Sequence, residues 1–374
     1  FWHSCALLWN GSVRCWGLHT HGELGLEPGV TEAASFAVNL GTNQEVVAIA
    51  AGDMHTCAML ASQVTADHGQ IKCWGSGEDG QLGLGNRMSK GDDPSEMGDA
   101  LRVVNDGLPE AKLLVAAGNY TCYVDELGDL RCWGSVRWLG VRLVPYRVPV
   151  PKVRGVSCGV SHCCAVTIAD EVRCWGHGSR GQLGLGSTED CAPEDARPVQ
   201  FLIGEKVLKL VVGDCFSCAS LLAGRLACWG CNSHGELGVL DWAPRGDRPF
   251  RTSLATTIVR VIPDSPAPGF DKKRSSRPEL SLGRSSCSVR PNSSLACWGS
   301  TPASSANETT AANFVPSVVL DDVSAVAVGE QHVCAVRHSA VLCWGSNSGG
   351  QLQHCQSNFT GSSDAVQFCL PQRT

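Results

Sequence analysis

The cysteines of this chain offer the most chemistry, because a thiolate can form a disulfide, bind a metal ion or act as a nucleophile. The chain has 21 cysteines in 374 residues. Seven of them begin a Cys-Trp-Gly tripeptide, and each has another cysteine 9 to 16 residues upstream. The seven pairs are Cys5 and Cys15, Cys57 and Cys73, Cys122 and Cys132, Cys164 and Cys174, Cys218 and Cys228, Cys287 and Cys297, and Cys334 and Cys343. One repeated unit therefore accounts for two thirds of the cysteines.

The residues around each pair predict a β-hairpin. Short apolar runs alternate with turn residues, and Asn10-Gly11, a turn-forming dipeptide, lies midway between Cys5 and Cys15. Cross-strand neighbours are about 4.5 to 5.5 Å apart, which a disulfide can bridge. We therefore predict seven disulfides, one in each unit. Closing a loop of about ten residues contributes on the order of 3 kcal/mol for each bond.

Two Cys-x-x-Cys pairs in the fifth unit have the spacing of a zinc site. Cys215, Cys218, Cys228 and Cys231 could supply the four thiolates of a tetrahedral centre. However, Cys215 and Cys231 are centred on the same hairpin midpoint as Cys218 and Cys228. We therefore predict a second cross-strand disulfide between Cys215 and Cys231, with zinc as the alternative.

The remaining cysteines give weaker patterns. Cys158 and Cys163 flank a short turn and are predicted to pair across it, and Cys355 and Cys369 are predicted to pair in the C-terminal segment. Cys191 is then left over, which makes it the candidate for an intermolecular disulfide.

Cysteine usage also predicts the compartment, because disulfides persist mainly in oxidising surroundings. Five Asn-x-Ser/Thr sequons favour the same compartment as glycosylation sites, at Asn10, Asn119, Asn292, Asn307 and Asn358. At Asn10 and Asn119 a plain turn asparagine is an equal alternative. We expect an extracellular or cell-surface protein that passes through the secretory pathway.

The period of the units predicts the architecture. Successive Cys-Trp-Gly motifs are 42 to 69 residues apart, which fits about four strands and one propeller blade. We predict an all-β fold, a single seven-bladed β-propeller over residues 1–374. The first unit lacks the apolar run that opens the others, so we expect a processed or excised piece. The approximate blades are 1–44, 45–109, 110–150, 151–204, 205–276 with an insertion at 241–276, 277–320 and 321–374.

The motifs resemble the regulator of chromosome condensation repeat family. The resemblance rests on Gly-x-x-His-x-x-Ala, then Trp-Gly, then Gly-Gln-Leu-Gly, and it covers nearly the whole chain. The family histidine matches His3, His55, His162 and His332, and the glycine loop matches Gly22–Gly25, Gly80–Gly83, Gly181–Gly184 and Gly235–Gly238. The cysteine pairs depart from the nuclear members and resemble secreted variants, some of which block β-lactamases.

Other classes of function are disfavoured by the sequence. The formal net charge is −6, the densest basic run is Lys272-Lys273-Arg274, and no apolar stretch reaches membrane-helix length, so we expect neither nucleic-acid binding nor membrane insertion. No catalytic or cofactor motif stands out, so no enzyme activity and no cofactor are predicted. We expect the recurring histidines to hydrogen-bond within their own blade. The recurring tryptophans are expected to pack between sheets, since the Gly-Trp-Arg-His-Thr run of the plant ultraviolet photoreceptor is absent.

Two segments interrupt the array, Met88 to Asn105 and Asp241 to Pro278. Loops on a rigid scaffold collect binding residues, so the rim bearing these insertions is expected to contact a protein partner. Within the second segment, Arg245-Gly246-Asp247 resembles the tripeptide that integrins recognise. We predict a non-catalytic extracellular interaction or structural module, part of a larger polypeptide or assembly. The alternatives are an exchange factor for a small GTPase and a secreted enzyme inhibitor.

Overall fold

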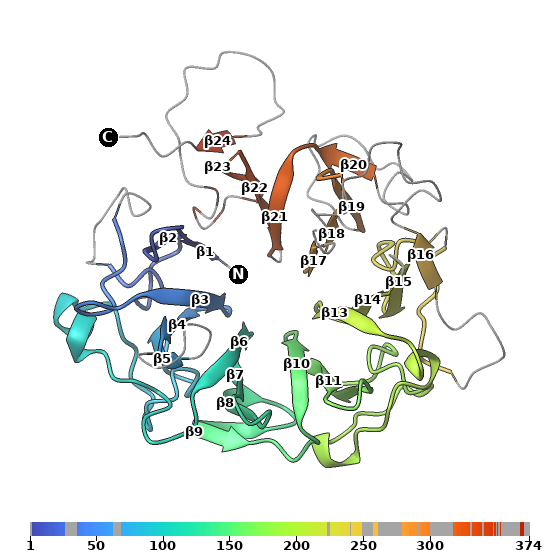
Figure 1. Ribbon diagram of the computed structural model, residues 1–374, viewed down its shortest axis with the longest axis horizontal. Coiled ribbons are helices and arrows are strands. Elements are labelled where there is room, and N and C mark those ends of the chain that lie inside the picture. Colours follow the sequence, from blue (N-terminus) through green and yellow to red (C-terminus); the bar gives the residue numbers. More distant parts are fainter. Residues whose placement is uncertain are drawn as a thin grey trace. The chain divides into compact units, whose positions relative to one another are not determined.

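The structure is a computed structural model of the 374-residue chain. It describes residues 2–26, 36–62, 69–222, 225–239, 241–248, 257–260, 279–283, 285–290, 292–299, 317–329, 331–338, 340–346, 348, 350, 352 and 367–369. The chain divides into two compact units, whose elements are labelled along the chain in Figure 1. Unit 1 contains Phe1–Ser161, Ala192–Asp195 and Asn347–His354, and unit 2 contains His162–Cys191, Ala196–Ser346 and Cys355–Thr374.

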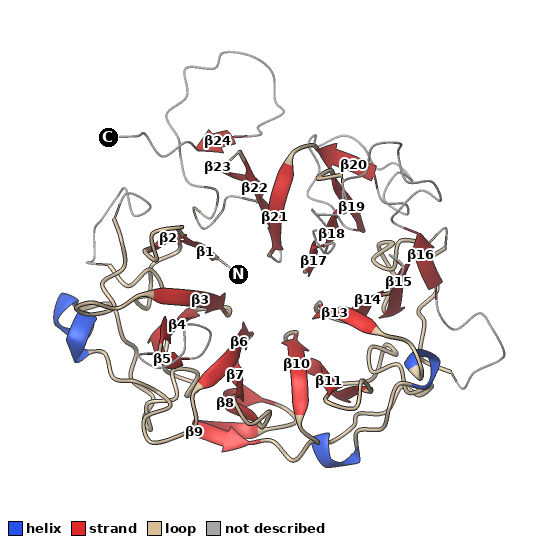
Figure 2. Cartoon of the chain, viewed as in Figure 1, coloured by secondary structure: helices blue, strands red, loops and turns tan. Residues whose placement is uncertain are grey.

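Unit 1 consists of antiparallel strands and short turns of 3-10 helix (Figure 2). A two-stranded sheet pairs β1 with β2, and a seven-stranded sheet runs in sequence order from β3 to β9. Within that sheet a single residue pair, Gly69 and Ala111, joins β5 to β6. The strands are β1 (His3–Leu7), β2 (Val13–Gly17), β3 (Val46–Ala51), β4 (His55–Ala61), β5 (Gly69–Gly75), β6 (Ala111–Ala117), β7 (Tyr120–Asp125), β8 (Leu130–Val136), β9 (Gly140–Arg147) and β10 (Val153–Cys158); the 3-10 helices are η2 (Pro94–Glu96), η3 (Gly98–Ala100) and η4 (Pro193–Asp195).

Unit 2 repeats the same antiparallel plan. It holds the β11–β12 hairpin and three four-stranded sheets, each in sequence order. The elements are β11 (His162–Thr167), β12 (Val172–Gly176), η5 (Gln200–Leu202), β13 (Val207–Val212), β14 (Phe216–Leu221), β15 (Arg225–Gly230), β16 (Thr257–Arg260), β17 (Glu279–Leu282), β18 (Ser285–Val289), β19 (Leu295–Gly299), β20 (Ser317–Leu320), β21 (Val323–Val328), β22 (His332–Arg337), β23 (Ala340–Gly345) and β24 (Gln367–Cys369).

Each of the seven repeat cysteine pairs lies in a hairpin, and we number the hairpins 1 to 7 in chain order. In each hairpin the two cysteines are direct cross-strand partners, with the tryptophan and glycine of Cys-Trp-Gly next along the second strand. The strands form because β-branched and small apolar residues alternate with polar ones between tight turns. The first hairpin forms a two-stranded sheet by itself, as expected because the first unit lacks the apolar run that opens the other units.

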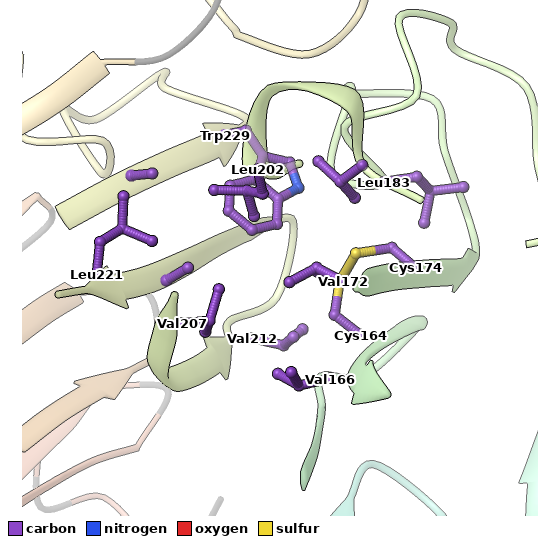
Figure 3. Packing of buried hydrophobic residues seen from close by; sticks show 13 residues of the cluster. Cys164, Val166, Val172, Cys174, Leu183, Leu202, Val207, Val212, Leu221 and Trp229 are labelled. Atoms are coloured by element: carbon purple, nitrogen blue, oxygen red, sulfur yellow. A yellow bond between two sulfur atoms is a disulfide. The ribbon is translucent and has the colours of Figure 1, made fainter. Parts of the chain in front are cut away.

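The hydrophobic cores lie between consecutive hairpins. The cluster in Figure 3 joins the Cys164–Cys174 disulfide of hairpin 4 to Trp229 of hairpin 5. The same arrangement places Trp74 with Cys15, Trp133 with Cys57 and Cys73, Trp298 with Cys218 and Cys228, and Trp344 with Cys287 and Cys297. A repeat therefore buries its tryptophan against the disulfide of the preceding repeat, as expected for a residue that packs between sheets.

The interpretation of Met88 to Asn105 as a rim insertion is wrong. Met97, Leu101 and Val104 from this segment are buried in the cores of unit 1. The Val104 amide donates to the Ile71 carbonyl at 2.8 Å, and Val38, Val148 and Val199 make the same bond at 2.8 Å to Val13, Leu130 and Val172. The segment is thus a regular part of the repeat that returns to the hairpin and completes its core.

None of the helices among the described residues has the length and apolar character needed to cross a membrane.

Candidate functional site

The recurring histidines link one hairpin to the next. His3 Nε2 lies 2.8 Å from Thr56 Oγ1, His55 Nε2 lies 2.7 Å from Thr121 Oγ1, and His162 Nε2 lies 2.9 Å from Ser217 Oγ. In each case the hydroxyl belongs to the following hairpin, 53 to 66 residues further along the chain. The prediction that these histidines bond within their own blade is therefore wrong.

The glycine loop completes this link through one backbone carbonyl. The Gln81 carbonyl accepts from Thr121 Oγ1 at 3.2 Å and from Trp133 Nε1 at 2.8 Å. The carbonyls of Glu23, Gln182 and Glu236 accept the corresponding pair of bonds from Thr56 and Trp74, Ser217 and Trp229, and Ser286 and Trp298. Histidine, hydroxyl, carbonyl and tryptophan thus form one repeated network between neighbouring repeats, which we call the junction network.

The last glycine of the loop allows the tryptophan of the next repeat to reach the loop carbonyl. A Cβ at Gly83 would lie 2.7 Å from Trp133 Nε1, and at Gly184 or Gly238 it would lie 3.0 Å from the indole nitrogen of the next tryptophan. Any side chain there would displace the indole from its carbonyl. The loop motif is therefore a docking surface for the next repeat, and its four residues are accounted for without a ligand.

The buried position of the histidines keeps them uncharged. Desolvation by burial lowers the pKa of His55 to about 3, and burial with a smaller effect of His177 lowers the pKa of His162 to about 3. Burial also lowers the pKa of His332 to about 4. For His55 and His162, a neutral imidazole that donates to a buried hydroxyl fits a structural role.

The sequence reasoning missed the hydroxyl residues of the junction network. Thr56, Thr121, Ser217 and Ser286 each directly precede the first cysteine of their hairpin, and each is fully buried. A buried hydroxyl must find a partner. Its recurrence one residue before a cysteine was the available signal.

All seven predicted repeat disulfides are present in the structure, with a Cα–Cα distance of 4.1 Å in every case. Most of the paired cysteines are completely buried. The disulfides are therefore part of the cores and are shielded from solvent reductants.

The second cross-strand disulfide predicted in hairpin 5 is also present. Cys215 precedes β14 and Cys231 follows β15, and the structure joins them by a disulfide with a Cα–Cα distance of 5.6 Å. The Cys231 amide donates to the Cys215 carbonyl at 2.9 Å. With Cys218 bonded to Cys228, all four sulfurs of the zinc alternative are engaged in disulfides, which provide no thiolate ligands.

The other cysteines are only partly described. Cys158 and Cys163 are buried and each is disulfide-bonded, while their mutual pairing stays a prediction. Cys355 lies outside the described residues and Cys369 ends β24, so their pairing also stays a prediction. Cys191 is half-buried, and its backbone bridges to Gly176 through bonds of 2.8 and 3.0 Å. Its proposed intermolecular bond is likewise a prediction.

The Arg245-Gly246-Asp247 tripeptide has a structural explanation. The backbone of Arg245 bridges to Gly230, as Lys90 bridges to Gly75 and Cys191 to Gly176. Its guanidinium is held by Asp241 at 2.5 Å and by the Ala243 carbonyl at 2.9 Å. Gly246 has a φ of 83°, and a Cβ there would lie 2.6 Å from the Gly181 carbonyl.

A second segment of the chain shows that this role recurs. Lys90-Gly91-Asp92 occupies the corresponding place, with a φ of 96° at Gly91 and a Cβ distance of 2.7 Å to the Gly22 carbonyl. A basic residue, a glycine and an aspartate thus recur because the repeat plan uses them to seat the preceding glycine loop. The integrin interpretation is not needed.

The sequons occupy two kinds of position. Asn10 and Asn292 are exposed at hairpin tips, where Oδ1 accepts the hydroxyl of Ser12 or Ser294 at 2.8 Å. Asn119 is half-buried, its amide donates to Asp79 at 2.7 Å, and its sequon hydroxyl is Thr121 of the junction network. Asn307 and Asn358 lie outside the described residues. Glycosylation at all five sites stays a prediction.

A groove of about 340 Å³ lies in unit 2 between the β11–β12 turn and the segment around η5. Asp170, Glu171 and Glu205 line it beside apolar Val172 and Leu202. Glu171 is already paired with Arg173 at 2.9 Å. The residues lining this groove include no histidine, cysteine, serine or threonine that could act as a nucleophile or base.

Disulfide-bridged hairpins, of which four successive pairs are joined by the junction network, are typical of a repeat β-propeller protein. The regulator of chromosome condensation (RCC1) repeat matches residues 10–59 and 170–220 in one family model, and 153–182 and 207–236 in a second. The chain carries RCC1 repeats, and the predicted RCC-type β-propeller fold is confirmed. The number of blades stays a prediction.

The chain is also similar to curated plant proteins of this kind. It is 31% identical over 216 residues to the Ultraviolet-B receptor UVR8 of Arabidopsis thaliana, covering 54% of this chain and 45% of the receptor. It is 31% identical over 274 residues to the mitochondrial RCC1 domain-containing protein RUG3 of the same species, covering 69% of this chain and 56% of RUG3. The chain thus spans about half the length of these relatives.

Solved structures show the same fold at lower identity. Yeast RCC1 (Prp20), solved with Kap60 bound, has a TM-score of 0.73 at 19% identity and covers 96% of this chain and 83% of its own. The ectodomain of the Arabidopsis thaliana receptor kinase ACR4 has a TM-score of 0.50 at 17% identity and covers 94% and 93%. At these identities the likeness is one of fold.

Proposed function

We propose that this chain is a non-catalytic, extracellular protein-interaction module, a disulfide-stabilised RCC-type propeller that presents surface loops and strand edges to a protein partner. The observation that carries the proposal is the disulfide in each of the seven repeat hairpins. Disulfides in such number are typical of oxidising compartments and would be held reduced in the cytosol during folding.

The solved structures support two parts of this proposal. Yeast RCC1 was solved in complex with Kap60, so the fold can serve as a platform for another protein. The ACR4 neighbour is a receptor-kinase ectodomain, so the fold also occurs outside the cell. Fold alone does not transmit function, and the exchange-factor alternative rests on no residue described in this chain.

The absence of catalysis is supported by how the recurring polar residues are used. The histidines, hydroxyls and loop carbonyls all serve the junction network, and the buried histidines are neutral near pH 7. The lining of the groove in unit 2 holds Asp170, Glu205 and Lys206 but no histidine, cysteine, serine or threonine. A scaffold function uses all of these residues, whereas an enzyme would need a further set.

The compartment is tested by labelling intact source cells and their medium with a membrane-impermeant amine-reactive biotin. The protein should be labelled before lysis or recovered from the medium, whereas a cytosolic marker should be labelled only after lysis. Labelling of this protein only after lysis would contradict the extracellular assignment. Chemical cross-linking of the same native material, followed by mass spectrometry, should identify a protein partner.

The sequons allow a second test with an internal control. Enzymatic removal of N-glycans converts a glycosylated asparagine to aspartate, which mass spectrometry detects. We expect conversion at the exposed tips, Asn10 and Asn292, and none at Asn119, whose sequon threonine is buried in the junction network. A protein without glycan at either tip would remove this support for the secretory pathway.

A further inference from the structure

Charge is distributed unevenly along the chain. Residues 130–169 contain no aspartate or glutamate, so all 36 acidic residues lie elsewhere. The same segment carries six basic residues, which are Arg131, Arg137, Arg142, Arg147, Lys152 and Arg154. In a chain with a formal net charge of −6, this segment is a local region of positive charge.

The segment contains an edge strand whose side chains are largely exposed, although its Leu143 carbonyl accepts from the Gly85 amide at 2.9 Å. β9 is the last strand of the seven-stranded sheet, and its neighbour in the sheet order is β8 (Figure 1). Because side chains alternate along a strand, Arg142, Val144 and Tyr146 share one face. All three are exposed, and the Arg142 guanidinium lies 4.6 Å from the centroid of the Tyr146 ring.

The cation of Arg142 is not neutralised within the protein. Its guanidinium contacts the Tyr146 ring, and it has no ion pair among the residues that the structure describes. A ring face holds a guanidinium in place without removing its charge, so Arg142 is positioned in advance for an anion.

The C-terminal end of β9 adds more positive charge. Arg147 contacts Asp129 at 2.9 Å, and Lys152 Nζ donates to the Leu127 carbonyl at 2.8 Å. The hydrogen bond from Arg147, followed by the charges of Arg147, Lys152 and Arg131, lowers the pKa of Asp129. Asp129 is therefore surrounded by three cations, but Arg131 is itself paired with Asp125 at 3.3 Å, so Arg142 carries the charge of this surface that no carboxylate neutralises. Glu126, three residues before Asp129 in the sequence, is a further exposed carboxylate.

Apolar side chains are exposed among these cations. Val144 and Leu127 are each 55% exposed, and Val141 and Tyr146 are each 42% exposed. Exposed aliphatic residues within a charged rim are typical of a protein-binding surface. A sulfated polysaccharide or a nucleic acid has no aliphatic side chains to cover the valines, and Arg142 already occupies one face of the tyrosine ring.

We propose that the β9 surface, formed by Arg142, Val144 and Tyr146 on one face of the strand, binds an acidic, extended polypeptide segment of a partner protein. Partner carboxylates contact Arg142, and partner apolar side chains cover Val144. The inference rests on the proposed function in requiring a protein partner, and it does not depend on the compartment.

The test uses the full chain and a fluorescein-labelled peptide of four Glu-Val repeats, with a Lys-Val peptide of equal length as the control. Fluorescence anisotropy should show binding of the acidic peptide alone, weakening as sodium chloride rises from about 50 to about 300 mM. Arg142→Glu should weaken binding at least about tenfold, because it removes one charge-assisted contact and adds a repulsive charge. Val144→Asp should weaken it by a similar factor.

Arg197→Glu is the matched control, since Arg197 is an exposed arginine outside this surface and the charge change is identical. It should alter binding less than about twofold, because at this position the substitution changes the net charge but removes no contact with the peptide. Equal weakening by both variants, or no binding of the acidic peptide to the wild-type chain at about 1 mM, would overturn the proposal.

Heparin and a duplex DNA oligonucleotide serve as competing polyanions. Binding of either one more tightly than the acidic peptide, unchanged by Val144→Asp, would assign the surface to a different class of macromolecule and overturn the proposal. Both variants lie on exposed positions, and their circular dichroism should match that of the wild type. A native partner cross-linked only at residues elsewhere would refute this inference and leave the proposed function standing.

Discussion

Replacing Thr121 with valine isolates one connection of the junction network. The Thr121 hydroxyl has one proton, which goes to the Gln81 carbonyl at 3.2 Å, so His55 Nε2 at 2.7 Å must be the donor to Thr121. Valine has nearly the same shape as threonine and keeps the packing. The Gln81 carbonyl still accepts from Trp133 Nε1 at 2.8 Å. The His55 N–H is left buried without its acceptor.

The expected loss of stability follows from that one unpaired donor. An unsatisfied buried polar group costs about 1 to 3 kcal/mol, so the free energy of unfolding should fall by about 2 kcal/mol. Thr121→Ser keeps the hydroxyl and should cost less than about 1 kcal/mol, the value of one buried methyl group. Serine occupies the corresponding place at Ser217 and Ser286, which shows that the network accommodates it.

Equilibrium unfolding in guanidinium chloride under non-reducing conditions, followed by tryptophan fluorescence, measures both losses. Thr42→Val is the surface control, because Thr42 is exposed and its hydroxyl contacts only Asp99 among the described residues. It should change the free energy by no more than about 0.5 kcal/mol. If Thr121→Val were no more destabilising than Thr42→Val, the junction network would not be holding neighbouring repeats together.

Three further outcomes are expected. The pKa values of His55 and His162 are about 3 in the folded protein and about 6.5 in the unfolded chain, so the stability that these histidines contribute is complete above pH 6.5 and falls as the pH drops toward 3. At pH 5 each histidine should lower the free energy of unfolding by about 2 kcal/mol. In a series of unfolding curves at different pH, His55→Gln should remove the part of this loss that His55 causes. Replacing Cys122 and Cys132 together with alanine, which opens a loop with a sequence separation of 10, should lower the free energy of unfolding by about 2.5 kcal/mol; a loss below about 0.5 kcal/mol would exclude the disulfide as a main stabiliser. Gly246→Ala should cost about 3 kcal/mol, because its Cβ meets the Gly181 carbonyl, whereas Gly107→Ala has the same sign of φ but open space and should cost about 1 kcal/mol; equal thermal unfolding shifts would contradict this difference.

Local features of the sequence predicted the hairpins and their cysteine pairs well. A cysteine pair, a turn between its members and a Trp-Gly after the second cysteine lie within one short segment, so cross-strand geometry alone brings Cys122 opposite Cys132. The second cross-strand disulfide, between Cys215 and Cys231, was predicted because this pair has the same hairpin midpoint as Cys218 and Cys228. The β-propeller fold followed from the period of the repeat and is confirmed by the structural comparisons.

Contacts between repeats could not be predicted in the same way. His55 finds its partner 66 residues away, in a hairpin whose placement depends on packing that no local pattern encodes. The own-blade expectation for the histidines failed for that reason. The segment Met88 to Asn105 was misread because its buried residues, Met97 and Leu101, stand in a mainly polar stretch of sequence and contact hairpins 1 and 2 only after the chain has folded back.

The β9 surface was also missed by the sequence reasoning. The longest irregular segments were predicted to contact the partner, whereas the positive, partly apolar surface lies on an edge strand. The sequence feature that indicates this surface is the absence of acidic residues over 130–169. A search for short motifs does not detect it, because it is a property of the charge of a whole segment.

The redox state of the repeat cysteines in native material tests the account most directly. Source material is treated with a thiol-alkylating reagent at the moment of lysis, digested without reduction and examined by mass spectrometry. We expect seven disulfide-linked peptide pairs, from Cys5–Cys15 through Cys334–Cys343, with none of these fourteen cysteines alkylated. Recovery of the same fourteen as alkylated thiols would contradict both the covalent hairpins and the extracellular function proposed from them.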